Sequence, residues 1–222
     1  MRLANQSLPT RSSMKFSSLF KLVSFRRLII RFWTLVTLCA LAHTTDAATY
    51  YLDNNGTTGG FGTAGGTWAA PTLNLWNLDS TGVATPEASI TTTTSDALHF
   101  GTATDGLAAG TITLSGTVSA NSLTFGSASG AITLGTAGQA ITLGGTTPTI
   151  TQNSAATMII ISPLAGSAGL VKEGSGILNL TAASNFSGGT TVNTGTLGLG
   201  VGGGAGTIRG ELTINSGATV NM

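Results

Sequence analysis

Short apolar runs alternate with polar turns along most of the chain. In one representative stretch the runs lie at 170–171, 177–180, 190–192 and 196–199, and Gly, Ser, Asn and Thr separate them. Apolar runs of this length, bounded by such residues, are typical of short β-strands joined by tight turns. The pattern therefore predicts a segment with a structural role rather than a reactive site.

Two spacings repeat within this pattern. The longer interval is twenty-two positions. It separates residues of the same kind at Leu170, Val192 and Ile214, at Asn193 and Asn215, and at Gly195 and Gly217. A shorter interval of nine positions separates Ile132, Ile141, Ile150 and Ile159. A short strand plus a turn accounts for the shorter interval, and two or three such strands close one coil of about 18 to 22 residues. We therefore expect stacked coils, with the first apolar set in one inward column and the four isoleucines also facing inward.

The fold class that this predicts is all-β, a right-handed parallel β-helix or β-solenoid. Ile, Leu and Val suit inward positions, and outward Thr suits the pleated surface of a strand. Asn-x-Gly supplies the positive φ angle of a sharp corner, and stacked Asn or Thr side chains can form ladders between coils. The alternative is an antiparallel sandwich with hairpins of the same length, which gives no reason for Asn and Gly to keep a fixed period.

One stretch has a more specific order. It contains Leu170, Lys172, Gly174, Gly176, Leu178 and Leu180, then Asn185-Phe186, Gly188-Gly189-Thr190-Thr191 and Gly195-Thr196-Leu197. In this order, residues 170–199 resemble the autotransporter-associated β-strand repeat, also called the passenger-associated transport repeat. The resemblance implies an exported bacterial β-helical stalk at the cell surface or outside the cell. It carries over no catalytic residue.

The N-terminal segment 1–47 differs in chemistry from the rest. Seven of the nine cations precede an apolar run at 32–42, which is shorter than the roughly 20 residues needed to span a bilayer. A basic segment before such a run predicts a signal peptide with a long basic region, cleaved after Ala47 or, as the second candidate, after Ala42. The alternative is an uncleaved anchor. Cys39 lies in the apolar run, so the mature chain would have no cysteine.

Removal of this segment changes the charge balance. After Ala47 only Lys172 and Arg209 are positive, and seven carboxylates remain. Nucleic-acid binding by counterion release needs clustered Lys and Arg, so we expect no nucleic-acid partner. We also expect contact with a membrane only through the signal peptide during export.

The segment 48–110 holds most of the aromatic residues of the mature chain. They include Tyr50, Tyr51, Trp68, Trp76 and Phe100. A solenoid needs a cap that covers the end of its core, so we predict an irregular N-terminal cap here. The alternative is an aromatic platform for sugar stacking.

Candidate chemistry is sparse. His99 would need Asp96 or Asp105 and a serine without any nucleophile motif, and it is interpreted as a partly exposed residue at a strand end. Lys172 and Glu173 are expected to form a solvated pair near a turn.

Three further patterns have structural interpretations. Residues 52–60 lack the acidic spacing of a calcium loop and predict an Asn-Gly turn. The glycines of 198–206 lack the strand and helix of a dinucleotide site and predict a loop between coils. The carboxylates between 79 and 105 are scattered. We therefore assign no catalytic residue, no cofactor-binding residue, no metal ligand and no cofactor.

The chain is thus divided into a signal peptide at 1–47, a cap at 48–110 and solenoid repeats at 111–222 that we expect to be incomplete at the C-terminus. The predicted function is a non-enzymatic, exported stalk with adhesive contact to glycan or extracellular matrix. The alternative function is an N-terminal segment of a longer autotransporter or secreted carbohydrate-active protein, whose functional part lies beyond residue 222.

Overall fold

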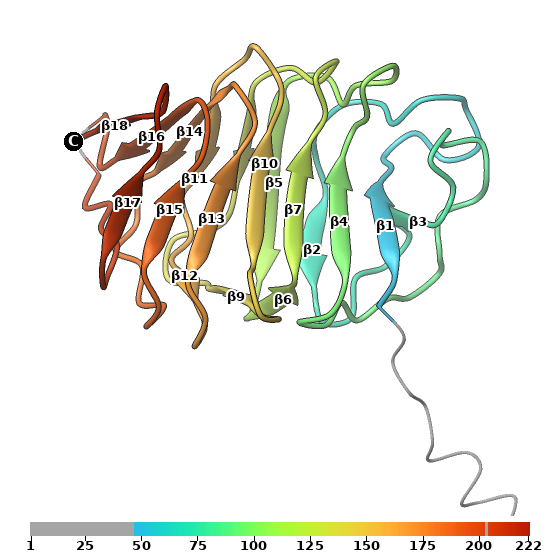
Figure 1. The fold of residues 1–222 in the computed structure, drawn as a ribbon. Helices are drawn as coiled ribbons and strands as arrows, with labels where there is room; N and C mark the ends of the chain where they lie inside the picture. The colour runs from blue at the N-terminus through green and yellow to red at the C-terminus, as the bar shows by residue number, and fades with distance from the viewer. Residues whose placement is uncertain (1–46, 203) are drawn as a thin grey trace, which may run out of the picture. The chain divides into compact units, whose positions relative to one another are not determined.

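The structure, a computed structural model, describes residues 47–202 and 204–222, and this part is built from β-strands in three sheets (Figure 1). The eight-stranded sheet has the order β17 (Leu212–Ile214), β15 (Thr190–Val192), β13 (Leu170–Glu173), β10 (Thr149–Gln152), β7 (Ser122–Phe125), β4 (Ala97–Phe100), β1 (Thr49–Leu52) and β3 (Trp76–Asn77). The seven-stranded sheet has the order β18 (Thr219–Asn221), β16 (Thr196–Leu199), β14 (Ile177–Leu180), β11 (Met158–Ile160), β8 (Ile132–Leu134), β5 (Gly110–Ser115) and β2 (Thr67–Ala69). The three-stranded sheet contains β12 (Leu164–Ala165), β9 (Ile141–Leu143) and β6 (Val118–Ala120).

The strands pair in parallel from one coil to the next, which confirms the solenoid prediction. The only antiparallel strand pair in the described ranges joins β3 to β1. The chain passes through β7, β8 and β9 before it returns to the eight-stranded sheet at β10. Ile132, Ile141 and Ile150 lie on three successive strands of this circuit. The spacing of these isoleucines is therefore the step from one side of a coil to the next.

The coils differ in length. In the eight-stranded sheet, the registers align Leu98 with Leu123 and Leu123 with Ile150, which delimits two long coils. The coils that follow, through Lys172 and Val192 to Ile214, are shorter. The expected length of about 18 to 22 residues is correct for these later coils and too short for the earlier ones, because the earlier coils include a full third strand.

One of the two inward columns in the structure differs from the predicted column at a single position. The register aligns Val192 with Ile214, as expected, but it places Lys172 rather than Leu170 beside Val192. Leu170 is buried two positions earlier, beside Thr190. The prediction of one column through Leu170 is wrong because the coil between β13 and β15 is shorter by two positions than the coil between β15 and β17.

The isoleucine set also contains one exception. Ile132, Ile141 and Ile150 are buried, whereas Ile159 is half-buried between the buried Met158 and Ile160. The register pairs Ile159 with Thr133, a partly exposed position of β8. Because strand side chains alternate between faces, Ile159 lies on the outward face and Met158 and Ile160 fill the core.

This alternation gives a matched pair of substitutions. Ile160→Val should reduce the free energy of unfolding by about 1 kcal/mol, because it removes one buried methyl group from a packed core. Ile159→Val should change it by less than about 0.5 kcal/mol, since the side chain is outward. Urea denaturation of both variants measures the difference. Equal losses would contradict the assigned register of β11.

Aromatic residues fill the core at the N-terminal coils. Trp68 and Trp76 are fully buried and meet edge to face with ring centroids 5.7 Å apart, and Trp76 meets Phe100 in the same way at 5.9 Å. Phe100 stacks on Phe125 of the next coil at 4.8 Å. Trp68 also donates its ring N–H to the Thr92 hydroxyl at 3.0 Å. These indole rings are core residues, so they are not available as a sugar-stacking surface.

Candidate functional site

The buried lysine of β13 is the most unusual ionisable group in the described ranges. Lys172 is 0% exposed, and its Nζ donates to the backbone carbonyls of Glu173 at 3.0 Å, Gly174 at 2.7 Å and Thr194 at 3.0 Å. Thr194 belongs to the following coil, so the ammonium ties two coils at their corner. The expectation of a solvated Lys172–Glu173 pair is wrong, because alternation along β13 directs Lys172 inward and Glu173 outward.

The environment of Lys172 affects its protonation. Burial lowers the pKa of Lys172 to about 8, against a smaller upward effect of the Glu173 carboxylate. Desolvation penalises the charged form of an amine, whereas the three carbonyls supply direct partners for that form. The Lys172 amino group therefore stabilises the fold, and its charge depends on pH.

Asparagine side chains form a ladder on the outside of the same corner. Asn193 Nδ2 donates to the Glu173 carboxylate, and Asn215 Nδ2 donates to Asn193 Oδ1 at 2.6 Å. The three residues occupy successive coils; the interval between Asn193 and Asn215 predicted this for the two asparagines, and Glu173 extends the ladder by one coil. The ladder confirms that stacked Asn side chains join coils.

The carboxylates near the N-terminal coils hold loops. Asp96 is buried and accepts hydrogen bonds from the Ala48 amide at 2.9 Å and from the amide and hydroxyl of Thr93. Asp53, also buried, accepts from Asn77 Nδ2 at 2.8 Å and from the Asn55 amide. The hydrogen bonds of both carboxylates in the described ranges go to these groups rather than to His99.

Asp79 orders an exposed turn. Hydrogen bonds from the amide and hydroxyl of Thr81 lower the pKa of the Asp79 carboxyl, and the amides of Ala84 and Val83 add to this effect. Asp105 accepts a hydrogen bond from the neighbouring Thr104 hydroxyl. In residues 47–202 and 204–222, no three His, Cys, Asp or Glu side chains are close enough together to hold a metal ion.

The predicted loops at 52–60 and 198–206 contain turns. Gly56 and Gly60 have positive φ angles of 70° and 86°, and Gly200 and Gly202 have angles of 67° and 87°. These are left-handed conformations that glycine adopts without a steric penalty. Among the residues that the structure describes, there is no helix with the length and hydropathy of a membrane span.

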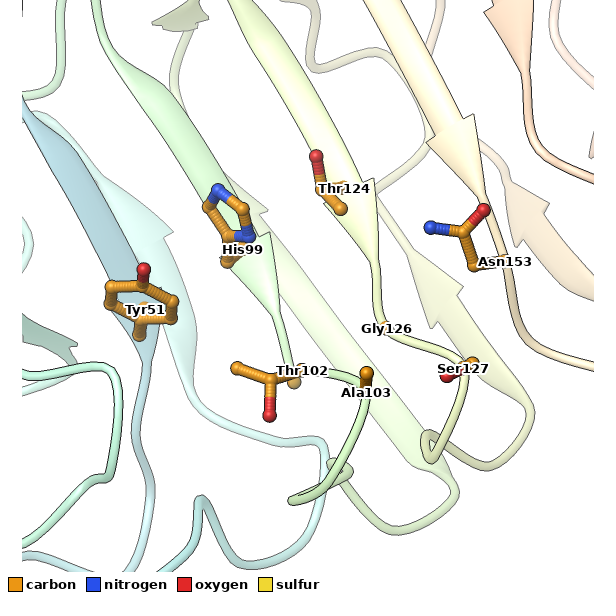
Figure 2. Close-up of a pocket in the computed structure, with 9 residues that line it drawn as sticks. Tyr51, His99, Thr102, Ala103, Thr124, Gly126, Ser127 and Asn153 are labelled. Carbon is orange, nitrogen blue, oxygen red and sulfur yellow. The ribbon is translucent and has the colours of Figure 1, made fainter.

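A hollow of about 260 Å³ lies on the outer face of the eight-stranded sheet, and Figure 2 shows its lining. Tyr51, His99 and Thr124 are register neighbours on β1, β4 and β7, so their side chains lie side by side. Asn153 follows β10, and the turns after β4 and β7 bring Thr102 and Ser127 to the same hollow. Four adjacent strands thus contribute to one surface feature.

His99 is held beside an aromatic ring. Its imidazole lies 4.9 Å from the Tyr51 ring centroid, and Tyr51 in turn stacks on the buried Phe61 at 5.8 Å. Partial burial lowers the pKa of His99. Sequence reasoning found His99 but not its neighbours, because Tyr51, His99 and Thr124 are separated by whole coils and meet only through the register.

Comparison with known proteins agrees with the fold. A sequence model of the Passenger-associated-transport-repeat family matches residues 170–199, the segment that contains β13 to β16 and the Lys172 corner. The Adhesin BmaC autotransporter of Brucella suis biovar 1 (strain 1330) is 45% identical over 75 residues, which are 34% of this chain and 2% of that protein. No solved structure matches the chain.

These findings define a class of protein, a parallel β-solenoid. Within that class, residues 170–199 match the passenger-associated transport repeat, and a segment of the chain is similar to an autotransporter adhesin. The chain spans about 2% of the length of the curated relative that it matches.

Proposed function

We propose that this chain is an exported, non-enzymatic stalk of the passenger type that acts at the bacterial surface or outside the cell. The observation that carries the proposal is the continuity of the matched repeat with the other coils. β13 pairs with β10 before it and with β15 after it, so the repeat is one section of a continuous stack. Stacked coils of this kind suit a spacer that positions other parts of a protein.

The roles of the ionisable side chains support a structural function. Lys172 satisfies carbonyls at a coil corner, and Asp53 and Asp96 hold loops near the first coils. A catalytic acid or base must reach a substrate, whereas these three groups are buried and engaged within the fold. We therefore assign them to folding rather than to turnover.

Adhesion is the contact function that we propose for the stalk. The relative from Brucella suis is named an adhesin, and that name applies to a protein of which this chain matches 2%. Outward positions of the eight-stranded sheet include Thr124, Thr151 and Thr191, which offer neutral polar groups on three of its strands, β7, β10 and β15. Such a surface suits contact with glycan or matrix.

Export is proposed from the N-terminal segment 1–47, of which 1–46 lie outside the described residues. The full-length chain with a C-terminal epitope tag should be cleaved in a bacterial host, so that N-terminal sequencing starts between His43 and Thr49. Antibody against the tag should label intact cells or the culture medium. The matched control, Leu35→Arg with Leu38→Arg, should stay uncleaved in the cytoplasm because it interrupts the apolar run. An uncleaved wild-type chain in the cytoplasm would refute export.

A further inference from the structure

The hollow on the eight-stranded sheet is lined by several polar side-chain groups that have no hydrogen-bond partner in the described part of the protein. Within the described ranges, the Tyr51 hydroxyl, the His99 ring nitrogens and the Thr124 hydroxyl make no hydrogen bond to another protein group. The same holds for the Ser127 hydroxyl and the Asn153 amide. Polar side chains elsewhere on the coils commonly have partners, as in the pair formed by the hydroxyls of Thr67 and Thr113.

The chemistry of this lining is neutral. No carboxylate, ammonium or guanidinium group is among its nine residues, which are Tyr51, His99, Gly101, Thr102, Ala103, Thr124, Gly126, Ser127 and Asn153. The partial burial of His99 favours the uncharged imidazole, which has one donor and one acceptor. A charged ligand would find no counter-charge here. A ligand with many neutral donors and acceptors matches the hydroxyls, imidazole and amide of the lining.

The rings are positioned for hydrogen bonding. Tyr51 is fixed by its stacking on Phe61 at an interplanar angle of 13° and by its contact with His99 at 33°. In Figure 2 Tyr51, His99 and Thr124 stand in that order on three neighbouring strands, with His99 between the other two. Because strand register sets this arrangement, the polar groups are ordered before any ligand arrives, which lowers the entropic cost of binding.

The size of the hollow limits the ligand. Its volume of about 260 Å³ is slightly below the range of roughly 300–1,000 Å³ that is usual for small-molecule sites. One sugar ring suits this volume, and the rest of an oligosaccharide can continue over the open surface. A second hollow farther along the same sheet, of about 220 Å³, is lined by Thr146, Thr147, Thr191 and apolar or glycine residues, and it has neither a ring nor an amide side chain.

We propose that the hollow lined by Tyr51, His99, Thr124 and Asn153 binds one unit of a neutral saccharide. Hydroxyl-rich sugars present alternating donors and acceptors, and the lining presents both kinds of group without a charge. This inference names a ligand class for the proposed adhesive function and therefore rests on it. Binding in solution is measured separately from surface location, so either can fail while the other holds.

The test uses the purified full-length chain and saturation-transfer NMR with four neutral probes: maltotriose, cellotriose, mannotriose and triacetylchitotriose. At least one should bind and shift the His99 imidazole signals. Thr124→Val and Asn153→Ala should each weaken that binding by about 3- to 10-fold, the effect of one neutral hydrogen bond. Thr213→Ala, on β17 of the same sheet but outside the hollow, should leave the affinity unchanged.

Trigalacturonate is the charged counter-probe, and it should bind more weakly than the best neutral trisaccharide. The proposal is overturned if no neutral probe binds at about 10 mM, a concentration that detects even weak association. It is also overturned if only trigalacturonate binds, or if Asn153→Ala retains wild-type affinity. Thermal unfolding of each variant shows whether the fold persists. Should Thr124→Val unfold, the exposed Asn153 decides the outcome.

Discussion

Replacement of Lys172 by alanine is expected to lower the free energy of unfolding by about 3–5 kcal/mol at pH 7. The change removes a long side chain from the core and leaves the carbonyls of Glu173, Gly174 and Thr194 without the ammonium donor. Lys172→Met should cost less, because it retains most of the packed stem. Urea denaturation at fixed pH measures both losses. A loss below about 1 kcal/mol for the alanine variant would show that the buried ammonium does not hold the corner.

The same side chain gives a pH dependence with a definite sign. The folded pKa of Lys172 is about 8 and the ordinary value is 10.5, so between these values the unfolded chain binds more protons than the folded chain. Stability then rises with pH, by at most about 1 kcal/mol per pH unit for this group once solvent screening is allowed for.

Lys172→Met lacks the titrating group, so it isolates this contribution from all others. Below the folded pKa of about 8, the difference in unfolding free energy between wild type and this variant should be constant. Between this pKa and the ordinary value of 10.5 it should change in favour of wild type. A change in favour of the variant over that interval would contradict the depressed pKa.

Gly188→Ala is expected to destabilise the fold by about 3 kcal/mol, because the coils approach closely at this position. An added Cβ would overlap the Gly169 amide nitrogen and would lie 2.5 Å from the Ala168 carbonyl carbon. Both are backbone atoms of the preceding coil, which cannot move without disturbing the ladder between β13 and β15. The melting temperature and the urea midpoint should fall together.

The matched control is Gly59→Ala. A Cβ there would meet only Val83 Cγ1, at 3.6 Å, which is an ordinary contact. The expected change is within about 0.5 kcal/mol. If the two alanine variants lost equal stability, steric contact between coils would not be the cause of the Gly188 effect.

Most of the fold was predictable from periodicity. Isoleucines at nine-position intervals mark successive sides of a coil, and Asn193 and Asn215 mark successive coils. These signals are local or repeat at a fixed period, so the sequence displays them directly. The exact register was less accessible, because the short coil between β13 and β15 shifts the alignment by two positions and exchanges Leu170 for Lys172.

The candidate site shows a second limit of sequence reasoning. Charged residues usually lie at the surface, so Lys172 and Glu173 were interpreted as a solvated pair. Only the alternation of β13, together with the carbonyls of two coils, shows how a buried ammonium is satisfied. Likewise, Tyr51 and Thr124 are far apart in the chain. They line one hollow because β1 pairs with β4 and β4 pairs with β7, and the two chain segments between these paired strands differ in length.

The parallel ladders between coils also determine how the solenoid responds to mechanical load. Their hydrogen bonds run from coil to coil, so tension between the two ends of the stack acts along the bonds rather than across them. A terminal coil pairs with a neighbour on one side only, so it peels away first. Each coil released between β4 and β17, of about 20 to 27 residues by its register, adds about 65 to 95 Å of extended chain. Under load, the solenoid would lengthen in discrete steps set by the residue count of each coil.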